Sequence, residues 1–328
     1  MTAAFRAPFD RRQRTRLAYM ATAAATRWAA AAGVDVMSLA RNPAVAATLD
    51  AGIRAEQCAR ALRPDVACRP TQPIHHHDGG GPGPAIVFLN GWTASGLVWP
   101  RDLIGALERD HRVIRIDNRG SGWSRHAPRP YSIGDLAGDV RRIIDDLGLG
   151  APTIVGLSMG GLIAQELALR WPDRVGRLVL LGTRPPSPED TAPPAAVTAS
   201  LLASPPKGVP LRRFLRDGWA TVTAPGFAAA HPERIDEMAA SIARRPTPRF
   251  AVLDQARAIA AWSGAARLRR LSVPTTVVHG TDDPLIPVRN GMRLAQLIPG
   301  SHYVELPNVG HLVPYEAPED VERVIRGF

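Results

Sequence analysis

The sequence predicts an α/β fold in which a mostly parallel sheet is covered by helices on both faces. From residue 85 onward, short β-branched and aliphatic runs alternate with longer segments of helical spacing, a pattern typical of parallel sheets. The 328 residues, 45% of them hydrophobic, are also enough to bury a full-size core.

The elements follow one another along the chain in a regular order. Buried runs predict strands over residues 86–89, 113–116, 153–155, 177–181, 275–278 and 303–306. Helical spacing predicts helices over residues 97–108, 133–147, 161–171, 288–298 and 316–326.

Residues 152–161 place a serine at a sharp turn between a strand and a helix. The β-branched run 153–155 leads into Gly-Leu-Ser-Met-Gly at 156–160, and helical spacing follows. A G-x-S-x-G turn in this context strains the serine backbone and exposes the hydroxyl beside a helix N-terminus. Glycines fit such a bend because they have no Cβ. We therefore predict Ser158 as a nucleophile.

A serine nucleophile needs a base and an acid that orients the base. His311 follows a short predicted strand and a turn near the C-terminus. Asp282 and Asp283 follow the buried run 275–278, so the chain order is Ser, Asp, His. Either aspartate could orient His311; Pro284, which fixes the loop just beyond Asp283, favours Asp283.

These motifs resemble the α/β-hydrolases, in particular the esterase/haloperoxidase-like group, and the tail resembles actinobacterial methylesterase-type serine hydrolases. The order Ser, Asp, His is the one expected in that fold. Further matching runs are IDNRGSGWS at 116–124, YSIGDLAGDV at 131–140 and GHLVP at 310–314. The resemblance covers residues 84–328 and implies an α/β-hydrolase core at 85–184 and 263–328.

The resemblance also implies roles for individual residues. The family's G-x-x-D-x-x-x-P spacing places the acid at Asp283. In this fold two backbone N–H groups form an oxyanion hole, which here belong to Trp92 and Met159. Most relatives carry His-Gly where this chain has Asn90-Gly91. Because the donor is a backbone N–H, we expect the hole to persist with different side-chain support.

The leading hypothesis is a serine hydrolase that cleaves a small-molecule carboxylic ester through an acyl-enzyme. Ser158 attacks, His311 transfers the proton and Asp283 orients His311, so that no cofactor is required. A thioesterase, a carbon–carbon-bond hydrolase, an acyltransferase or a perhydrolase could use the same triad. A ligand-binding receptor with this fold is the non-enzymatic alternative.

Between residues 185 and 262 the alternation stops for longer than a loop allows in a compact domain. Helix-like stretches at 211–222, 233–244 and 249–262 predict a helical cap over the active site. Its large apolar residues either face the substrate pocket or only hold the cap together. The candidates for the substrate pocket are Phe214, Trp219, Phe227, Met238 and Trp262.

Residues 1–70 are expected to form a helical N-terminal extension, with helices near 12–32 and 43–62, joined by a linker at 71–84. The extension has eleven arginines against five acidic residues, net +6 of the total +10. Such a basic segment suggests contact with a membrane surface or an acidic partner, and its helices suit self-association. No nucleic-acid motif accompanies it, so nucleic-acid binding is not expected.

Cysteine content and hydropathy indicate the compartment. Cys58 and Cys68 are the two cysteines, too few for a disulfide framework. The apolar stretch near the N-terminus is alanine-rich and broken by Arg27, and no run approaches the ~20 residues of a membrane span. A cytoplasmic protein, free or membrane-associated, is expected, and secretion stays open.

Two groups of histidines need separate mention. His75, His76 and His77 precede Asp78 in the predicted linker, where no second ligand cluster follows at zinc spacing. No metal site is therefore expected there. His279 ends the run before the acid loop and is expected at the edge of the core.

Overall fold

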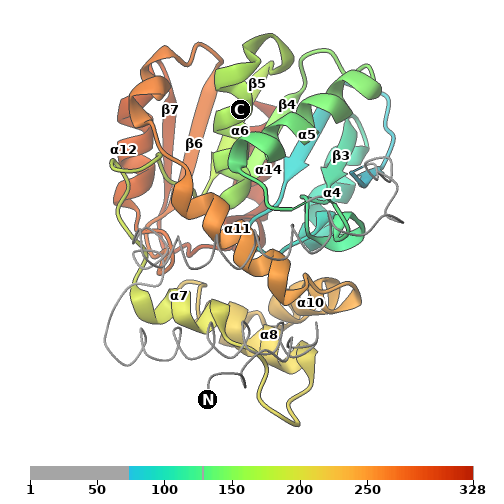
Figure 1. Cartoon of the computed structure of the whole chain (residues 1–328), viewed down its shortest axis with the longest axis vertical. Helices are drawn as coiled ribbons and strands as arrows, with labels where there is room; N and C mark the ends of the chain where they lie inside the picture. Colours follow the sequence, from blue (N-terminus) through green and yellow to red (C-terminus); the bar gives the residue numbers. More distant parts are fainter. Residues whose placement is uncertain (1–73, 128, 328) are drawn as a thin grey trace, which may run out of the picture.

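The computed structural model describes residues 74–127 and 129–327, which form a seven-stranded sheet flanked by helices (Figure 1). The strands lie in the order β1-β3-β2-β4-β5-β6-β7. All neighbouring pairs are parallel except β1 and β3, which are antiparallel. The strands are β1 (His76–Asp78), β2 (Ala85–Leu89), β3 (Arg112–Ile116), β4 (Thr153–Leu157), β5 (Arg177–Leu181), β6 (Thr275–Gly280) and β7 (His302–Leu306).

The six predicted strands are β2 to β7, and β1 is an addition. It lies in the stretch predicted as a linker, residues 71–84, and pairs with β3 with His77 opposite Arg115. Three residues are too few to show a strand pattern in the sequence. The predicted N-terminal helices and both cysteines lie outside the described residues.

Helices cover both faces of the sheet, as predicted. On one face α5 (Ile133–Asp146), α6 (Met159–Arg170) and α12 (Arg289–Leu297) pack on alternate strand residues such as Val87 and Leu89. On the other face α4 (Arg101–Glu108) and α14 (Pro318–Arg326) pack on the intervening residues. The inner strands β2, β4, β5 and β6 therefore bury both of their faces, which explains their hydrophobic runs.

Prolines divide two of the predicted helices. Pro100 separates the 3₁₀ turn η1 (Gly96–Val98) from α4, and Pro318 starts α14 after the short helix α13 (Val313–Glu316). A proline at a first helical position loses no hydrogen bond, whereas one inside a helix does. The sequence predicted that the helix after Ser158 begins at residue 161. Helix α6 begins two residues earlier, at Met159, directly after Ser158.

A helical insertion, residues 185–262, separates β5 from β6. It contains α7 (Ala195–Leu202), α8 (Leu211–Ala220), α9 (Phe227–Ala230), α10 (Pro232–Arg244) and α11 (Arg249–Ala261). Figure 1 shows α7, α8 and α10 grouped at one end of the molecule, with α11 running between them and the sheet. Trp92 connects the insertion to the rest of the protein, since the indole Nε1 of Trp92 donates to the carbonyl of Val252 in α11.

Within the part of the chain that the structure describes, no helix has the length and apolar character needed to cross a bilayer.

Candidate active site

Ser158 lies between β4 and α6 in a backbone conformation that most residues avoid, with φ 53° and ψ −115°. Its N–H donates to the carbonyl of Leu181 at 2.9 Å, and the Thr183 hydroxyl donates to its carbonyl at 2.7 Å. The glycines are required sterically: a Cβ on Gly156 would lie 2.5 Å from the carbonyl oxygen of Gly160. Hydrogen bonds and close packing thus hold the strained turn in place.

His311 and Asp283 form a buried pair. Nδ1 of His311 lies 2.8 Å from Oδ2 of Asp283, and the other carboxylate oxygen accepts the N–H groups of Leu285 and Ile286 at 2.9 and 2.7 Å. This arrangement places the imidazole proton on Nδ1 and leaves Nε2 to act as a base. Asp282 is half-buried, and its carboxylate accepts a hydrogen bond from the Thr281 hydroxyl and none from His311, so the structure pairs the aspartate that the sequence favours.

The surroundings of Asp283 keep it ionised. Burial alone would raise its pKa, but the charge of His311 and hydrogen bonds from His279 and His311 outweigh that effect and lower the pKa to about 2. His279 is fully buried, with Nε2 2.8 Å from the carbonyl oxygen of Ile286 and 3.4 Å from Asp283 Oδ2. His279 was expected at the edge of the core; it lies in β6 and is fully buried, where it contacts the loop that carries Asp283.

Glu316 anchors the loop that carries His311. Its Oε2 accepts the N–H groups of Gly310 and of Ala224 in the helical insertion, both at 2.8 Å, and Oε1 accepts the N–H of Leu312 at 3.0 Å. Burial raises the pKa of Glu316, while these three hydrogen bonds oppose the rise. The sequence analysis missed this residue, because its partner at 224 is brought near only by the fold.

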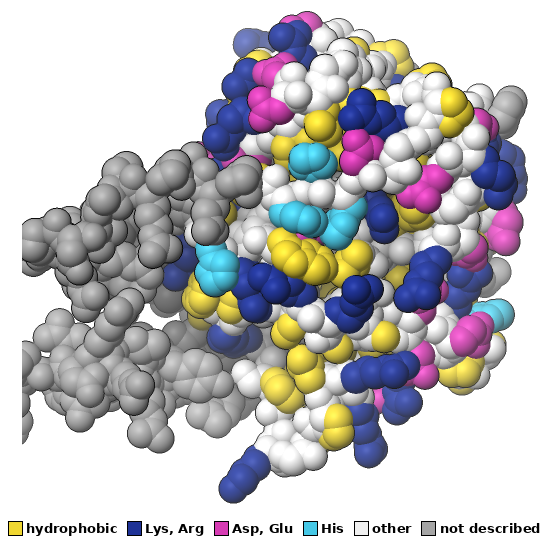
Figure 2. Space-filling model, turned by 90° about the vertical axis from the view of Figure 1, so that its right-hand side faces the viewer, with side chains coloured by type: hydrophobic (Ala, Val, Ile, Leu, Met, Phe, Trp, Pro, Cys, Tyr) yellow, Lys and Arg dark blue, Asp and Glu magenta, His cyan; other side chains and the backbone are white. Residues whose placement is uncertain are grey.

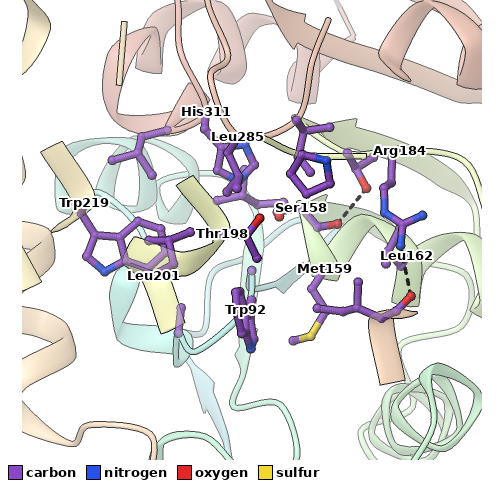
Figure 3. A pocket seen from close by; sticks show the side chains of 18 of the residues that line it. Trp92, Ser158, Met159, Leu162, Arg184, Thr198, Leu201, Trp219, Leu285 and His311 are labelled. Carbon is purple, nitrogen blue, oxygen red and sulfur yellow. Dashed lines mark hydrogen bonds between the residues drawn. The ribbon is translucent and has the colours of Figure 1, made fainter. Parts of the chain in front are cut away.

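Ser158 and His311 line one hollow of about 900 Å³, a volume that includes the part open to solvent. Figure 3 shows Ser158 between His311 and Trp92. Trp92 and Met159 belong to the lining, and Met159 is the first residue of α6, where backbone N–H groups lack intrahelical acceptors. The lining is mostly apolar.

The helical insertion supplies part of this lining. Of the five predicted pocket residues, Trp219 and Met238 line the hollow. Thr198 and Leu201 of α7 also line it, and both are labelled with Trp219 in Figure 3. The sequence analysis did not predict α7. Whether a residue of the insertion faces the hollow thus depends on how its helix is rotated about its own axis.

Phe214, Phe227 and Trp262 lie outside the lining, contrary to the prediction. Trp262 is buried in the core on the α6 side, where its Nε1 donates to Glu166 at 3.1 Å. Phe227 packs against His231, with ring centroids 4.8 Å apart, and Phe214 is half-buried on α8. For these three residues the structure favours the alternative, that they hold the insertion together.

Arg184 and Asp190 put two opposite charges in the wall of the hollow. Both are almost fully buried, and Nη1 of Arg184 lies 2.7 Å from Oδ2 of Asp190. Arg184 also donates to the carbonyl of Ile259 on α11. The sequence analysis missed this pair, whose opposite charges neutralise each other inside a mostly apolar wall.

Asn90 supports the turn that leads to Trp92. Its Nδ2 donates to the carbonyl of Ile116 at 2.6 Å, its Oδ1 accepts the indole N–H of Trp99, and Asn118 donates to its carbonyl at 2.9 Å. The Asn90 amide therefore holds the turn both as a hydrogen-bond donor and as an acceptor. We expected the turn to have side-chain support of its own kind because Asn90 replaces the usual histidine. In this chain the support comes from the Asn90 amide and from Asn118.

Comparisons with known proteins agree with this geometry. A family model described as alpha/beta hydrolase fold matches residues 84–318. The 3-oxoadipate enol-lactonase 2 of Acinetobacter baylyi is 30% identical over 250 residues, 75% of this chain and 90% of that protein. A poly(3-hydroxyalkanoate) depolymerase of Ectopseudomonas oleovorans is 32% identical over 248 residues, which are 75% of this chain and 83% of that protein.

Among solved structures, a thermophilic esterase from Thermogutta terrifontis superposes with a TM-score of 0.64 and 28% identity, covering 77% of this chain and 91% of that one. The region that the family model matches contains strands β2 to β7, Ser158, Asp283 and His311. The chain therefore belongs to the α/β-hydrolase-fold family, within its esterase-like group, and is a hydrolase.

Proposed function

We propose that the protein is a serine hydrolase that cleaves carboxylic esters through an acyl-enzyme. One observation carries the proposal: His311, whose Nδ1 lies 2.8 Å from Asp283, lines the same hollow as Ser158, whose turn is strained. A nucleophile and a base in one hollow, with an acid behind the base to orient it, are the parts that acyl transfer requires.

The proposed reaction has two halves. In the first, His311 Nε2 takes the proton of the Ser158 hydroxyl as its oxygen attacks the ester carbonyl. The N–H groups of Trp92 and Met159 stabilise the tetrahedral oxyanion, which collapses to the acyl-enzyme as His311 gives the proton to the leaving alcohol. In the second half His311 activates water, which releases the acid and restores Ser158. Asp283, ionised throughout, stabilises the charged His311.

The lining of the hollow favours an uncharged substrate with an apolar acyl or alcohol group. The helical insertion acts as a cap in this proposal, and Trp219, Met238 and Leu201 form its contact surface. Arg184 and Asp190 satisfy each other, so a charged substrate would have to disrupt a buried pair. The two curated relatives are named for a lactone, which is a cyclic ester, and for a polyester.

The proposal is tested with p-nitrophenyl esters of increasing acyl length, a matched thioester and a lactone. Turnover of the oxygen esters is expected, with kcat/KM rising with acyl length until the hollow is filled. Ser158→Ala should lower kcat by about 10⁶-fold, as in serine proteases. Preference for the thioester, a burst without turnover, or more than a tenth of wild-type kcat in Ser158→Ala would each contradict the proposal.

A further inference from the structure

A second group of chemically active side chains lies around edge strand β1 and the end of β3, outside the hollow that contains Ser158. One ligand atom each from His75, His77 and Asp117 lie within 4.8 Å of one another. Nδ1 of His75 is 3.2 Å from Oδ2 of Asp117, and Nε2 of His77 is 3.9 Å from Oδ1. Figure 2 shows histidine side chains gathered on one face of the molecule. We propose that these three residues bind a divalent transition-metal ion, with zinc as its representative.

The two histidine nitrogens are shielded from solvent and have no hydrogen-bond partner among the described residues. They lie close to a carboxylate, yet neither is aligned to donate to it. A buried polar atom without a partner destabilises the folded state. A metal ion between the three groups would satisfy both nitrogens. His75 and His77 can share one ion because residues two apart point to the same side of an extended chain.

Asp117 is already fixed in the position of a ligand. It is fully buried, and its two oxygens accept the N–H groups of Gly96 at 2.7 Å and Trp123 at 2.9 Å. An ionised carboxylate has about four acceptor sites, so lone pairs remain for a metal. The indole of Trp123 stacks on His75, with ring centroids 5.1 Å apart, and meets His77 edge-on at 5.4 Å. Such support orients metal ligands and tunes affinity.

Two imidazole nitrogens and one carboxylate oxygen suit zinc or a similar first-row ion, with water completing the coordination. Ligands about 2.0 Å from zinc lie roughly 3.3 Å apart in a tetrahedral site. The 3.2 Å separation of His75 from Asp117 fits this geometry, and the 3.9 Å separation of His77 requires a small closure. Arg115 lies near this cluster and its charge opposes the ion, so the affinity should be below that of a four-ligand structural site.

The sequence analysis expected no metal site, because no second ligand cluster follows the histidines at zinc spacing. The fold supplies the third ligand from the end of β3 instead. A metal there would join β1 to the turn after β3, whose Asn118 donates to the carbonyl of Asn90. The ion would stabilise this edge of the sheet without contacting the reacting atoms.

The test is calorimetric titration of the metal-stripped full-length protein with zinc, combined with thermal melting. His75→Gln and His77→Gln remove ligands, and His76→Gln is the matched control on the opposite side of the strand. A Cys58→Ser/Cys68→Ser variant removes the thiols that could also bind zinc. Circular dichroism without zinc checks that each variant folds. Asp117 is left unchanged because its hydrogen bonds hold two loops.

We expect zinc to bind the wild type and raise its melting temperature. Affinity should fall by about tenfold or more in His75→Gln and His77→Gln, and should be unchanged in His76→Gln and in the cysteine variant. The proposal is overturned if the wild type binds no zinc, if His76→Gln weakens binding as much as His75→Gln, or if binding disappears in the cysteine variant.

Discussion

The loops at the carboxyl ends of the strands and the helical insertion contribute to the same hollow in different ways. Ser158, Asp283 and His311 are held by hydrogen bonds of 2.7 to 2.9 Å that involve the backbone on at least one side. The insertion contributes mainly side-chain surface, from residues such as Trp219 and Leu201. The difference suggests that the chemistry depends on fixed backbone geometry, whereas substrate choice depends on packing.

The largest difference should appear between two adjacent aspartates. Asp283→Asn is expected to lower kcat by about 10⁴-fold, because an amide in that position favours the wrong tautomer of His311. Asp282→Asn, the matched control, should stay within a few-fold of wild type, since Asp282 makes no hydrogen bond with His311. The measurement is kcat of both purified variants from steady-state kinetics. A larger loss in Asp282→Asn than in Asp283→Asn would identify Asp282 as the acid.

A smaller loss is expected where the two regions meet. Glu316→Gln replaces an oxygen that accepts backbone N–H groups with an NH₂ group that cannot. The His311 loop should then shift, and a displacement of an ångström can cost about 10²-fold in rate. We expect kcat to fall between tenfold and about 10²-fold with KM nearly unchanged. A variant with wild-type kcat would show that the loop holds its position without Glu316.

The paired acid also gives stability a definite pH dependence. Folding lowers the pKa of Asp283 from 3.8 to about 2, so the unfolded chain binds more protons between these values. Stability is therefore fully present above about pH 4 and lost as pH falls toward 2, by about 2 kcal/mol. Denaturant unfolding of wild type and Asp283→Asn at pH 5 and pH 3 measures the free energy of unfolding of each protein at both pH values. The stability advantage of the wild type should shrink at pH 3; a constant difference would contradict the assignment.

The mildest effect is expected from the pocket wall. Trp219→Ala should lower kcat/KM for long-chain esters by about tenfold, as expected from the loss of roughly 1–3 kcal/mol of apolar contact, and leave short esters nearly unaffected. Phe227→Ala serves as the control, since Phe227 is in the same insertion but outside the hollow. Equal losses on short and long esters would mean that Trp219 supports the fold and does not select the substrate.

The sequence predicted strands β2 to β7 and the placement of Ser158, Asp283 and His311 because local patterns mark them: Ser158 and Asp283 follow buried runs, and His311 follows a short strand and a turn. It predicted the orientation of the insertion less well: Trp219 and Met238 line the hollow, and Trp262 does not. The rotation of a helix about its axis is set by tertiary packing, which a hydrophobic pattern does not specify.

Contacts distant in sequence were missed for the same reason. Glu316 binds the N–H of Ala224, and Asp117 lies beside His75 and His77, across separations that no local motif marks. Strand β1 has three residues and gains its identity only by pairing with β3. Such features depend on which elements the fold brings together, so the structure was needed to find them.

The central claim, that Ser158 is a nucleophile activated by His311, is tested most directly by mass spectrometry after treatment with a p-nitrophenyl phosphonate ester. The account predicts a single phosphonyl adduct on the Ser158 peptide in the wild type, formed far more slowly in His311→Ala and absent in Ser158→Ala. An adduct on another residue, or equal labelling rates in wild type and His311→Ala, would contradict it.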